Sequence, residues 1–394
     1  MYRKLLKYSS KSLIIIILLF MIHRIYINDI DKDLIFGSDK FMTNLNRNCY
    51  CCGRSEMNEN YDSEKIWNLS KKNIQNYIIK NNDIFTYYDL KEKKYKINLN
   101  LTIDDICIET DESFDEYTND EKIHKNMGIF FVFNKKRNVI EFVLNHTVYD
   151  FLKAGKFMSL IYYKPFQAVH DISPYYKYKP FVNELIMLST YINYISYFSE
   201  KTYKFNKFEI VKNRFIRKTF PGKLYTNTNF KKSEINLALT LYHIFKSLTV
   251  KIDYFKVAYL IGLKNDRFRN NYTCILLRIP FSLNFKNIII NVKKEIKKNK
   301  FYVFGIYDIL NYSININLQT NLKEKIHLQF TNIYTKNEKL GKLVNCTYIL
   351  LNKPSTPFYV TSSYTNNKNC ISIQYSTPDI DIKKLNSPLK HFNV

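Results

Sequence analysis

Apolar and polar positions follow two different periods along this chain. Apolar residues recur every three to four positions at 63–82, 231–248 and 285–299, a spacing that predicts amphipathic helices. Short runs rich in β-branched and aromatic residues predict strands at 129–133, 139–144, 254–263, 272–283, 346–351, 358–365 and 370–376. Residues 134–138 join the first two runs into a hairpin, and the apolar positions after residue 150 and at 183–198 predict further helices. Helices and strands alternate in both halves of the chain, which predicts an α/β or α+β fold in two halves.

The N-terminal segment has a different pattern. An apolar run at Leu13–Ile22 is interrupted by His23 and Arg24 and then extends to Ile27, with basic residues before it and aspartates after it. This length and charge distribution predict a basic tail at 1–11, a transmembrane signal anchor at 12–27 and a single-pass membrane protein with a cytoplasmic N-terminus. A buried or interfacial helix is the alternative. The polar residues 28–60 are interpreted as a linker to two domains, 61–205 and 206–394.

Composition narrows the classes of function. The chain has 394 residues and is 46% hydrophobic, so it can bury a substantial core. Its formal net charge is +25, but lysines occur along the whole chain and the frequent residue types match A/T-rich codons, so we do not expect nucleic acid as a partner. With 8 glycines, the chain shows no glycine-rich phosphate loop.

Three cysteines, Cys49, Cys51 and Cys52, lie close together after the predicted anchor. A zinc site needs a second set of cysteines or histidines at a suitable spacing, and none follows them. We therefore predict no metal and interpret these residues as free thiols, with disulfide pairing or lipidation as alternatives.

A histidine and an aspartate four residues apart form the candidate catalytic pair. His146 and Asp150 lie in "VLNHTVYDFL", where a predicted strand ends and a predicted helix begins. A neutral imidazole titrates near physiological pH and can take a proton from a hydroxyl, an amine or a thiol. The aspartate can cap the helix or pair with a distant arginine. On the pentapeptide alone, a buried histidine beside a capping aspartate explains the pattern better than a catalytic pair does.

The order of elements around this pair resembles the CoA-dependent acyltransferase superfamily with the His-x-x-x-Asp motif. That superfamily includes chloramphenicol acetyltransferase, peptide-synthetase condensation domains and wax ester synthase/diacylglycerol acyltransferases. The likeness continues in "SEINLALTLYHIFKSL", "FKVAYLIGLKNDRFRNNYTCILLRIPF", "QFTNIYT" and "PFYVTSSYTNNKNCISIQYSTPDI", and it covers about residues 60 to 390. The resemblance implies two chloramphenicol-acetyltransferase-like halves, each a mixed sheet with helices, that meet along a tunnel.

The resemblance also implies roles for individual residues. His146 would be the general base, and Asp150 would hold the loop geometry by pairing with Arg267. Acyl-CoA would be the co-substrate, and the acceptor would be a small molecule or a lipid with a hydroxyl or an amine. The remaining positions carried over are the oxyanion or substrate-positioning residues Thr331, Asn332 and Asn271, and the tunnel-lining residues Asn145 and Phe151.

Two positions depart from the family pattern. Asn145 stands where the family often has a first histidine, and Phe151 stands where glycine usually follows the aspartate. A phenylalanine would narrow the tunnel or mark a domain without activity. The sequence therefore predicts a membrane-anchored acyltransferase, with a catalytically inactive acyltransferase-like domain that serves as an anchored structural or virion-type protein as the alternative. The acyl donor, the acceptor and the oligomeric state do not follow from the sequence.

Overall fold

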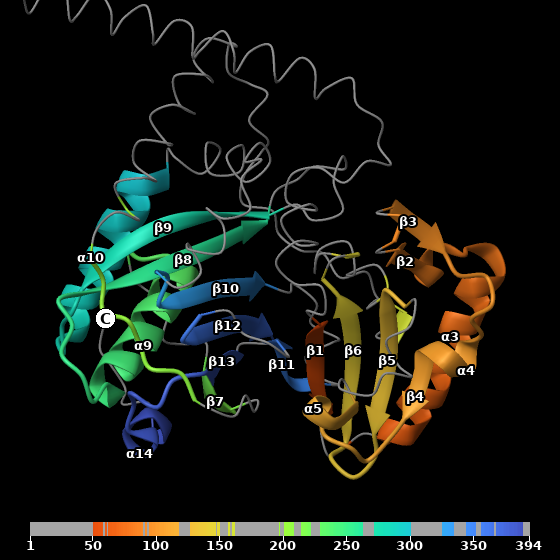
Figure 1. Ribbon diagram of the computed structural model, residues 1–394. Coiled ribbons are helices and arrows are strands. Elements are labelled where there is room, and N and C mark those ends of the chain that lie inside the picture. The colour runs from red at the N-terminus through yellow and green to blue at the C-terminus, as the bar shows by residue number, and fades with distance from the viewer. Residues whose placement is uncertain are drawn as a thin grey trace, which may run out of the picture.

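The computed structural model describes residues 50–57, 60, 62–89, 91–92, 94–117, 127–146, 148–149, 157, 160–161, 197, 201–208, 214–221, 229–262, 272–300, 325–334, 344–351, 356–365 and 368–388. These residues form two larger sheets that lie beside each other and one small hairpin (Figure 1). The prediction of a mixed α/β fold is therefore confirmed. The predicted tail and anchor at 1–27 lie outside the described residues.

The first sheet has five strands, whose spatial order is β11 (Val344–Leu351), β1 (Tyr50–Met57), β6 (Val139–Asn145), β5 (Ile129–Asn134) and β4 (Cys107–Glu109). The β5–β6 pair is the hairpin that the sequence predicted, with Ile129 opposite Leu144. Its turn needs one residue with positive φ, and Asn138 supplies it at 51°. Both strands are buried almost throughout, which suits their continuous apolar sequences.

The second sheet has six strands, in the order β7 (Arg214–Pro221), β13 (Lys368–Tyr375), β12 (Phe358–Thr365), β10 (Leu328–Tyr334), β8 (Tyr254–Gly262) and β9 (Tyr272–Pro280). Strands β8, β10 and β12 are parallel to one another, and the other pairings are antiparallel. The predicted strands at 254–263, 272–283, 358–365 and 370–376 correspond to β8, β9, β12 and β13.

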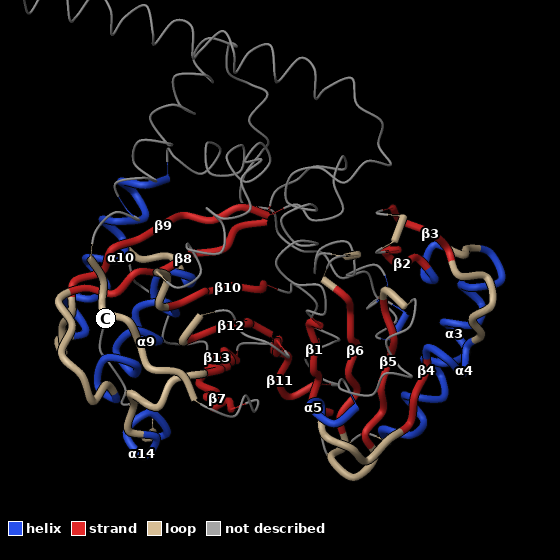
Figure 2. The backbone as a smooth tube through the Cα atoms, in the orientation of Figure 1, coloured by secondary structure: helices blue, strands red, loops and turns tan. Residues whose placement is uncertain are grey.

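Helices cover the outer sides of both sheets (Figure 2). Beside the first sheet lies α3 (Ser63–Lys80), which is capped by Asp62, whose side chain accepts the Lys65 amide hydrogen. The helix packs on this sheet through Trp67, which stacks on Phe133 with ring centroids 5.7 Å apart. In the second region α9 (Lys232–Ser247) and α10 (Phe285–Asn299) confirm the helices predicted there. Shorter elements complete the described part: η1 (Asp83–Phe85), β2 (Thr86–Asp89), β3 (Lys94–Ile97), α4 (Ile103–Ile106), α5 (Phe114–Tyr117) and α14 (Ile382–Asn386).

The interpretation of residues 28–60 as an irregular linker was wrong for residues 50–57. These residues form β1, which lies between β11 and β6 in the first sheet. This strand carries two charged residues, Arg54 and Glu56. Arg54 is buried and forms an ion pair with buried Glu141, and Glu56 pairs with Arg217 of the second sheet. The charges are compensated by residues far away in the sequence, which no local pattern reveals.

The two sheets are joined by β11. This strand comes from the C-terminal part of the chain and pairs with β1 of the first sheet, with Cys51 opposite Leu351. The Gln374 side chain of β13 bonds the amide and the carbonyl of Leu351 at 3.0 and 2.5 Å, and the Thr361 hydroxyl donates to the Ile349 carbonyl at 3.2 Å. The first sheet is thus completed by a segment from the predicted domain 206–394. The division into two acyltransferase-like halves stays a prediction.

Candidate functional site

His146 is the first residue after β6 and lies half-buried in a turn. The turn begins at Asn145, whose amide donates to the Gly128 carbonyl at 2.8 Å. The Asn145 carbonyl accepts the amide hydrogens of Val148 at 2.9 Å and Tyr149 at 3.1 Å. These bonds close one helical turn directly at the end of the strand, so the His146 backbone is fixed on both sides.

The turn that carries His146 is locked by packing beneath it. Val148 and Tyr149 are buried, and the Tyr149 hydroxyl donates to the Asp83 carbonyl at 2.5 Å. The Tyr149 ring meets Phe157 edge-on, with centroids 5.5 Å apart. Phe157 belongs to helical residues after the motif, where the sequence predicted a helix. The backbone of the turn therefore presents the His146 side chain from a rigid support.

Gly128 allows this close packing. A Cβ atom placed on Gly128 would lie 2.2 Å from the Thr86 carbonyl oxygen and 2.9 Å from side-chain atoms of Val148 and Tyr149. The residue before β5 must therefore be glycine for the turn to lie against the segment at Thr86. Reasoning from the sequence did not single out Gly128, although it is one of only 8 glycines in the chain.

Four residues of the predicted site lie outside the described residues. These are Asp150, Phe151, Arg267 and Asn271. The pairing of Asp150 with Arg267 and the effect of Phe151 on a tunnel therefore stay predictions.

Thr331 and Asn332 lie on β10, one position apart. The backbone of Thr331 is opposite Thr361 of β12 and Leu260 of β8, and Asn332 is opposite Ser362. The carboxyl ends of the parallel strands β8, β10 and β12 point toward the first sheet (Figure 1). Sites in sheets with parallel strands are commonly built at those ends.

A network of amide and hydroxyl groups orients Asn332. The Asn236 side chain on α9 donates to Asn332 Oδ1 at 3.3 Å and to Asn369 Oδ1 at 3.2 Å, and it also contacts the Ser362 hydroxyl. Asn236, Ser362 and Asn369 are buried. The Oδ1 atom of Asn332 faces this network, so its Nδ2 group points away from Asn236. The Thr331 hydroxyl is buried and has no hydrogen-bond partner among the described residues.

Asn236 was missed by reasoning from the sequence, although a signal was present. It interrupts the apolar run "INLALTL" of α9, on a helix that is buried along most of its length. A lone amide in such a run needs buried hydrogen-bond partners. That requirement points to a polar cluster in the sheet that the helix covers.

Two other histidines, His243 and His327, are buried in the second region. His327 is 1% exposed, with Nδ1 accepting the Lys256 amide hydrogen at 3.2 Å and Nε2 3.0 Å from the Tyr203 carbonyl oxygen. Burial lowers the pKa of His327 to about 4 and the pKa of His243 to about 3. Both imidazoles are therefore neutral and enclosed, in contrast to the half-buried ring of His146.

The described residues lack what a metal site and a membrane-spanning helix require. No cluster of three or more His, Cys, Asp or Glu side chains suited to a metal ion occurs among them. Cys51, Cys52, Cys107 and Cys274 are free thiols. Within the part of the chain that the structure describes, no helix is both long enough and apolar enough to cross a bilayer.

Comparisons with known proteins give matches of fold only. No family model and no curated protein matches the sequence. A trichothecene 15-O-acetyltransferase from Fusarium sporotrichioides aligns over 86% of this chain and 89% of its own, with a TM-score of 0.58 and 10% identity. A wax ester synthase/diacylglycerol acyltransferase from Marinobacter aquaeolei VT8 aligns over 88% and 96%, with a TM-score of 0.56 and 10% identity.

A third similar structure contains bound ligands. The starter condensation domain of rhizomide synthetase, in complex with C8-CoA and Leu-SNAC, aligns over 90% of this chain and 91% of its own, with a TM-score of 0.56 and 6% identity. The alignments cover most of each protein, and condensation domains and wax ester synthase/diacylglycerol acyltransferases are among the proteins that the sequence motifs resemble. The chain therefore has the fold of the CoA-dependent acyltransferase and condensation-domain superfamily.

Proposed function

We propose that this chain transfers an acyl group from a CoA-type thioester to a hydroxyl or amine acceptor, with His146 as the general base. The observation that carries the proposal is the position of His146. It is half-buried on a locked turn at the end of β6, in a chain with an acyltransferase fold. The proposal includes a membrane anchor at 12–27, which would favour a lipid acceptor such as a long-chain alcohol or diacylglycerol.

The proposed reaction needs one proton acceptor and a place for negative charge. An imidazole nitrogen of His146 takes the acceptor proton while the acceptor oxygen or nitrogen attacks the thioester carbonyl carbon. The carbon–sulfur bond of the tetrahedral intermediate then breaks, and the CoA sulfur leaves with the proton that His146 returns. A positioned base of this kind contributes roughly 10²–10⁴ to the rate.

Thr331 and Asn332 are the proposed donors to the oxyanion or to the substrate. The buried Thr331 hydroxyl has no acceptor among the described residues, and the network at Asn236 directs Nδ2 of Asn332 away from itself. Donors fixed before the reaction stabilise developing charge without having to reorient, and loss of one typically costs about 10²–10³ in rate. Asp150, Arg267 and Asn271 keep the roles that the resemblance implies.

The test is product formation by the full chain in detergent micelles. Acyl-CoA of several chain lengths is combined with a long-chain alcohol, diacylglycerol and a small amine, and acylated products are measured by mass spectrometry. We expect His146→Gln to lower the rate by about 10²–10⁴ without changing the melting temperature. Lys135→Gln, an exposed change in the turn of the same β5–β6 hairpin, should leave the rate unchanged.

A second function is favoured by one observation. Phe151 follows the aspartate of the motif, where the superfamily usually has glycine, and a domain without activity could then serve as an anchored structural or virion-type protein. If the folded wild-type chain forms no product with any donor and acceptor, or if His146→Gln retains the full rate, the transferase proposal is wrong. Replacement of Phe151 by Gly that creates activity in an inactive wild-type chain would support the structural role.

A further inference from the structure

The positive charge of the chain belongs to one of its two regions. Residues 50–161, which carry four of the five strands of the first sheet, contain 16 basic and 18 acidic residues. Residues 201–388, which carry the second sheet, contain 32 basic and 10 acidic residues. Codon composition enriches lysine in both regions to a similar degree, but it does not explain the loss of acidic residues from one of them. This asymmetry revises the expectation that the charge is a uniform background.

Helix α10 concentrates this charge on its outer face. Its inner face packs into the second core through Phe285, Ile288, Ile289 and Val292. The outer face carries the exposed lysines Lys286, Lys293, Lys294, Lys297 and Lys298. The helix has one acidic residue, Glu295, which is half-buried, accepts from the Arg278 amide and from Asn299, and lies 3.6 Å from the Lys298 ammonium group. Lysine therefore dominates the face that α10 turns to solvent.

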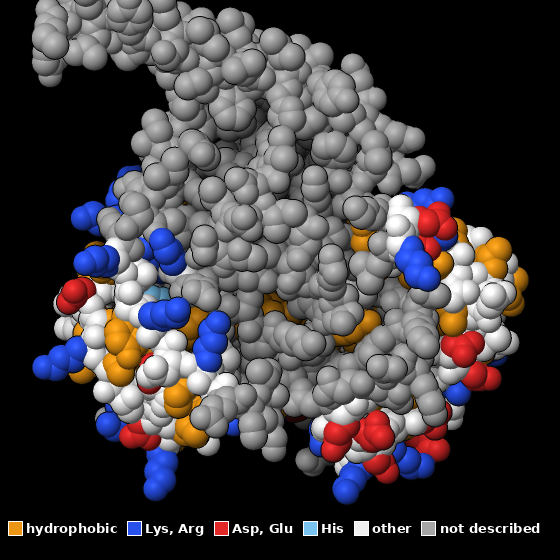
Figure 3. Space-filling model, in the orientation of Figure 1, with side chains coloured by type: hydrophobic (Ala, Val, Ile, Leu, Met, Phe, Trp, Pro, Cys, Tyr) orange, Lys and Arg blue, Asp and Glu red, His pale blue; other side chains and the backbone are white. Residues whose placement is uncertain are grey.

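Exposed apolar side chains accompany these lysines. Leu283 is 59% exposed just before α10, and Ile290 is 47% exposed on the lysine face itself. Phe281 is 36% exposed on the same approach to the helix. We call the five lysines together with Phe281, Leu283 and Ile290 the α10 surface. Figure 3 shows blue side chains prevailing on the side of the molecule that carries α9 and α10, whereas red and blue mix on the side that carries α3.

We propose that the α10 surface docks on a bilayer that contains anionic phospholipids. Lysine ammonium groups are attracted by anionic headgroups, and each adds to the binding. Exposed leucine and isoleucine side chains among basic residues are stabilised when they leave water and enter the boundary between headgroups and acyl chains. Nucleic acid would engage the lysines but would gain little from Leu283 and Ile290. The signal anchor that the sequence predicts at 12–27 would also place this region beside a membrane.

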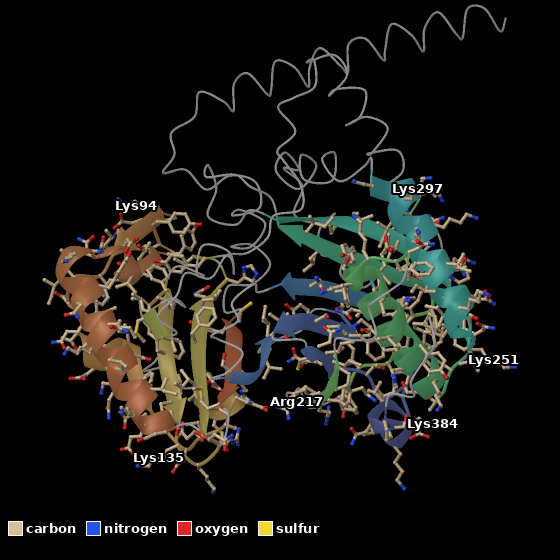
Figure 4. The ribbon with its side chains drawn as sticks, turned by 180° about the vertical axis from the view of Figure 1, so that it is seen from behind. Lys94, Lys135, Arg217, Lys251, Lys297 and Lys384 are labelled. Atoms are coloured by element: carbon tan, nitrogen blue, oxygen red, sulfur yellow. The ribbon has the colours of Figure 1, made fainter. Side chains whose placement is uncertain are left out.

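The α10 surface lies on the outer side of the second region. Figure 4 shows Lys297 of this surface near one end of α10. Lys293 donates to the Asn229 carbonyl at 2.8 Å and lies 4.9 Å from the Phe230 ring centroid, which holds its ammonium group at the surface. The docking site uses none of the residues placed in the acyl-transfer reaction, and it shares with that proposal only the anchor predicted at 12–27.

The experiment measures the protection of lysines in the full chain, reconstituted into vesicles. One set contains phosphatidylcholine alone, and the other contains about one third phosphatidylserine. An amine-acylating reagent labels accessible lysines, and peptide mass spectrometry gives the labelling rate of each. We expect the α10 lysines to react roughly threefold or more slowly in the anionic vesicles, and to recover in about 0.5 M NaCl. Lys65, Lys72, Lys80 and Lys135 of the first region should react at one rate throughout.

Two variants separate a bilayer from other polyanions. The double change Leu283→Ser with Ile290→Ser should reduce the protection in anionic vesicles and leave the fold intact, because both side chains are exposed. A fourfold variant that replaces Lys65, Lys72, Lys80 and Lys135 by glutamine removes four charges from the first region. It should leave the protection of the α10 lysines unchanged. The proposal is overturned if the α10 lysines react equally in both vesicle types. It is also overturned if duplex DNA in detergent protects them equally well and the double serine change has no effect on the protection by vesicles.

Discussion

The two regions bury their charged groups in different ways. In the first region the buried cation Arg54 faces the buried carboxylate Glu141, which also accepts the Tyr117 hydroxyl hydrogen. In the second region buried basic side chains meet neutral groups. Lys218 lies 3.4 Å from His243 Nδ1 and donates to the Ser387 carbonyl, and Lys256 donates to the Tyr197 carbonyl. The stability of the first region should therefore depend on its buried ion pair. The stability of the second region should depend on pH.

The largest expected effect is the loss of the buried carboxylate. Glu141→Ala removes the carboxylate that forms the ion pair with buried Arg54, and we expect the free energy of unfolding to fall by about 3–5 kcal/mol. The matched change is Glu64→Ala, which removes an exposed partner of Lys135 and should cost no more than about 1 kcal/mol. Urea denaturation of both variants measures the difference. Equal costs would show that the buried pair has no special weight.

The second effect is the pH dependence of the second region. The pKa of His327 is lowered to about 4 by burial, whereas an unfolded histidine titrates near 6.5. The unfolded state therefore binds a proton first, so the contribution of His327 is complete above about pH 6.5 and declines as the pH falls toward 4. In urea titrations at pH 7.5 and 4.5, we expect the stability gap between wild type and His327→Gln to shrink by about 2–3 kcal/mol at the lower pH. A gap that does not change with pH would contradict this.

The smallest expected effect is a gain in stability, from the replacement of buried Lys218. Burial, and secondly the charge of Lys246, lower the pKa of Lys218 to about 8. Its ammonium form at neutral pH therefore costs stability. Lys218→Met removes this cost while it keeps the aliphatic volume, and we expect the protein to gain about 1–3 kcal/mol. Thermal unfolding at pH 7 checks the sign, and a lower melting temperature would mean that the bonds of Lys218 outweigh its desolvation.

Local patterns predicted the elements whose burial is continuous. The hairpin at β5 and β6, the helices α3, α9 and α10, and the strands β8, β9, β12 and β13 follow from apolar periodicity, because each packs a whole face or run into a core. Strand β1 did not follow, because Arg54 and Glu56 are compensated by Glu141 and Arg217. Pairing between residues so distant in sequence is set by the fold and not by local propensity.

The residues of the candidate site also differ in whether the sequence alone could identify them. His146 could be singled out because its chemistry and its place at the end of a strand are local features. Gly128 and Asn236 could not be assigned a role, because their importance comes from contacts with Thr86 and with Asn332 and Asn369. A residue that orients the site through tertiary contacts becomes recognisable only once the elements around it are placed.

The central claim is that His146 accepts a proton during acyl transfer, and the pH dependence of kcat/KM tests it most directly. For the wild-type chain we predict that log kcat/KM rises with unit slope through the titration of one histidine and then levels off. For folded His146→Gln we predict a rate lower by about 10²–10⁴ with this rise absent. A variant that retains both the wild-type rate and the wild-type slope would contradict the account.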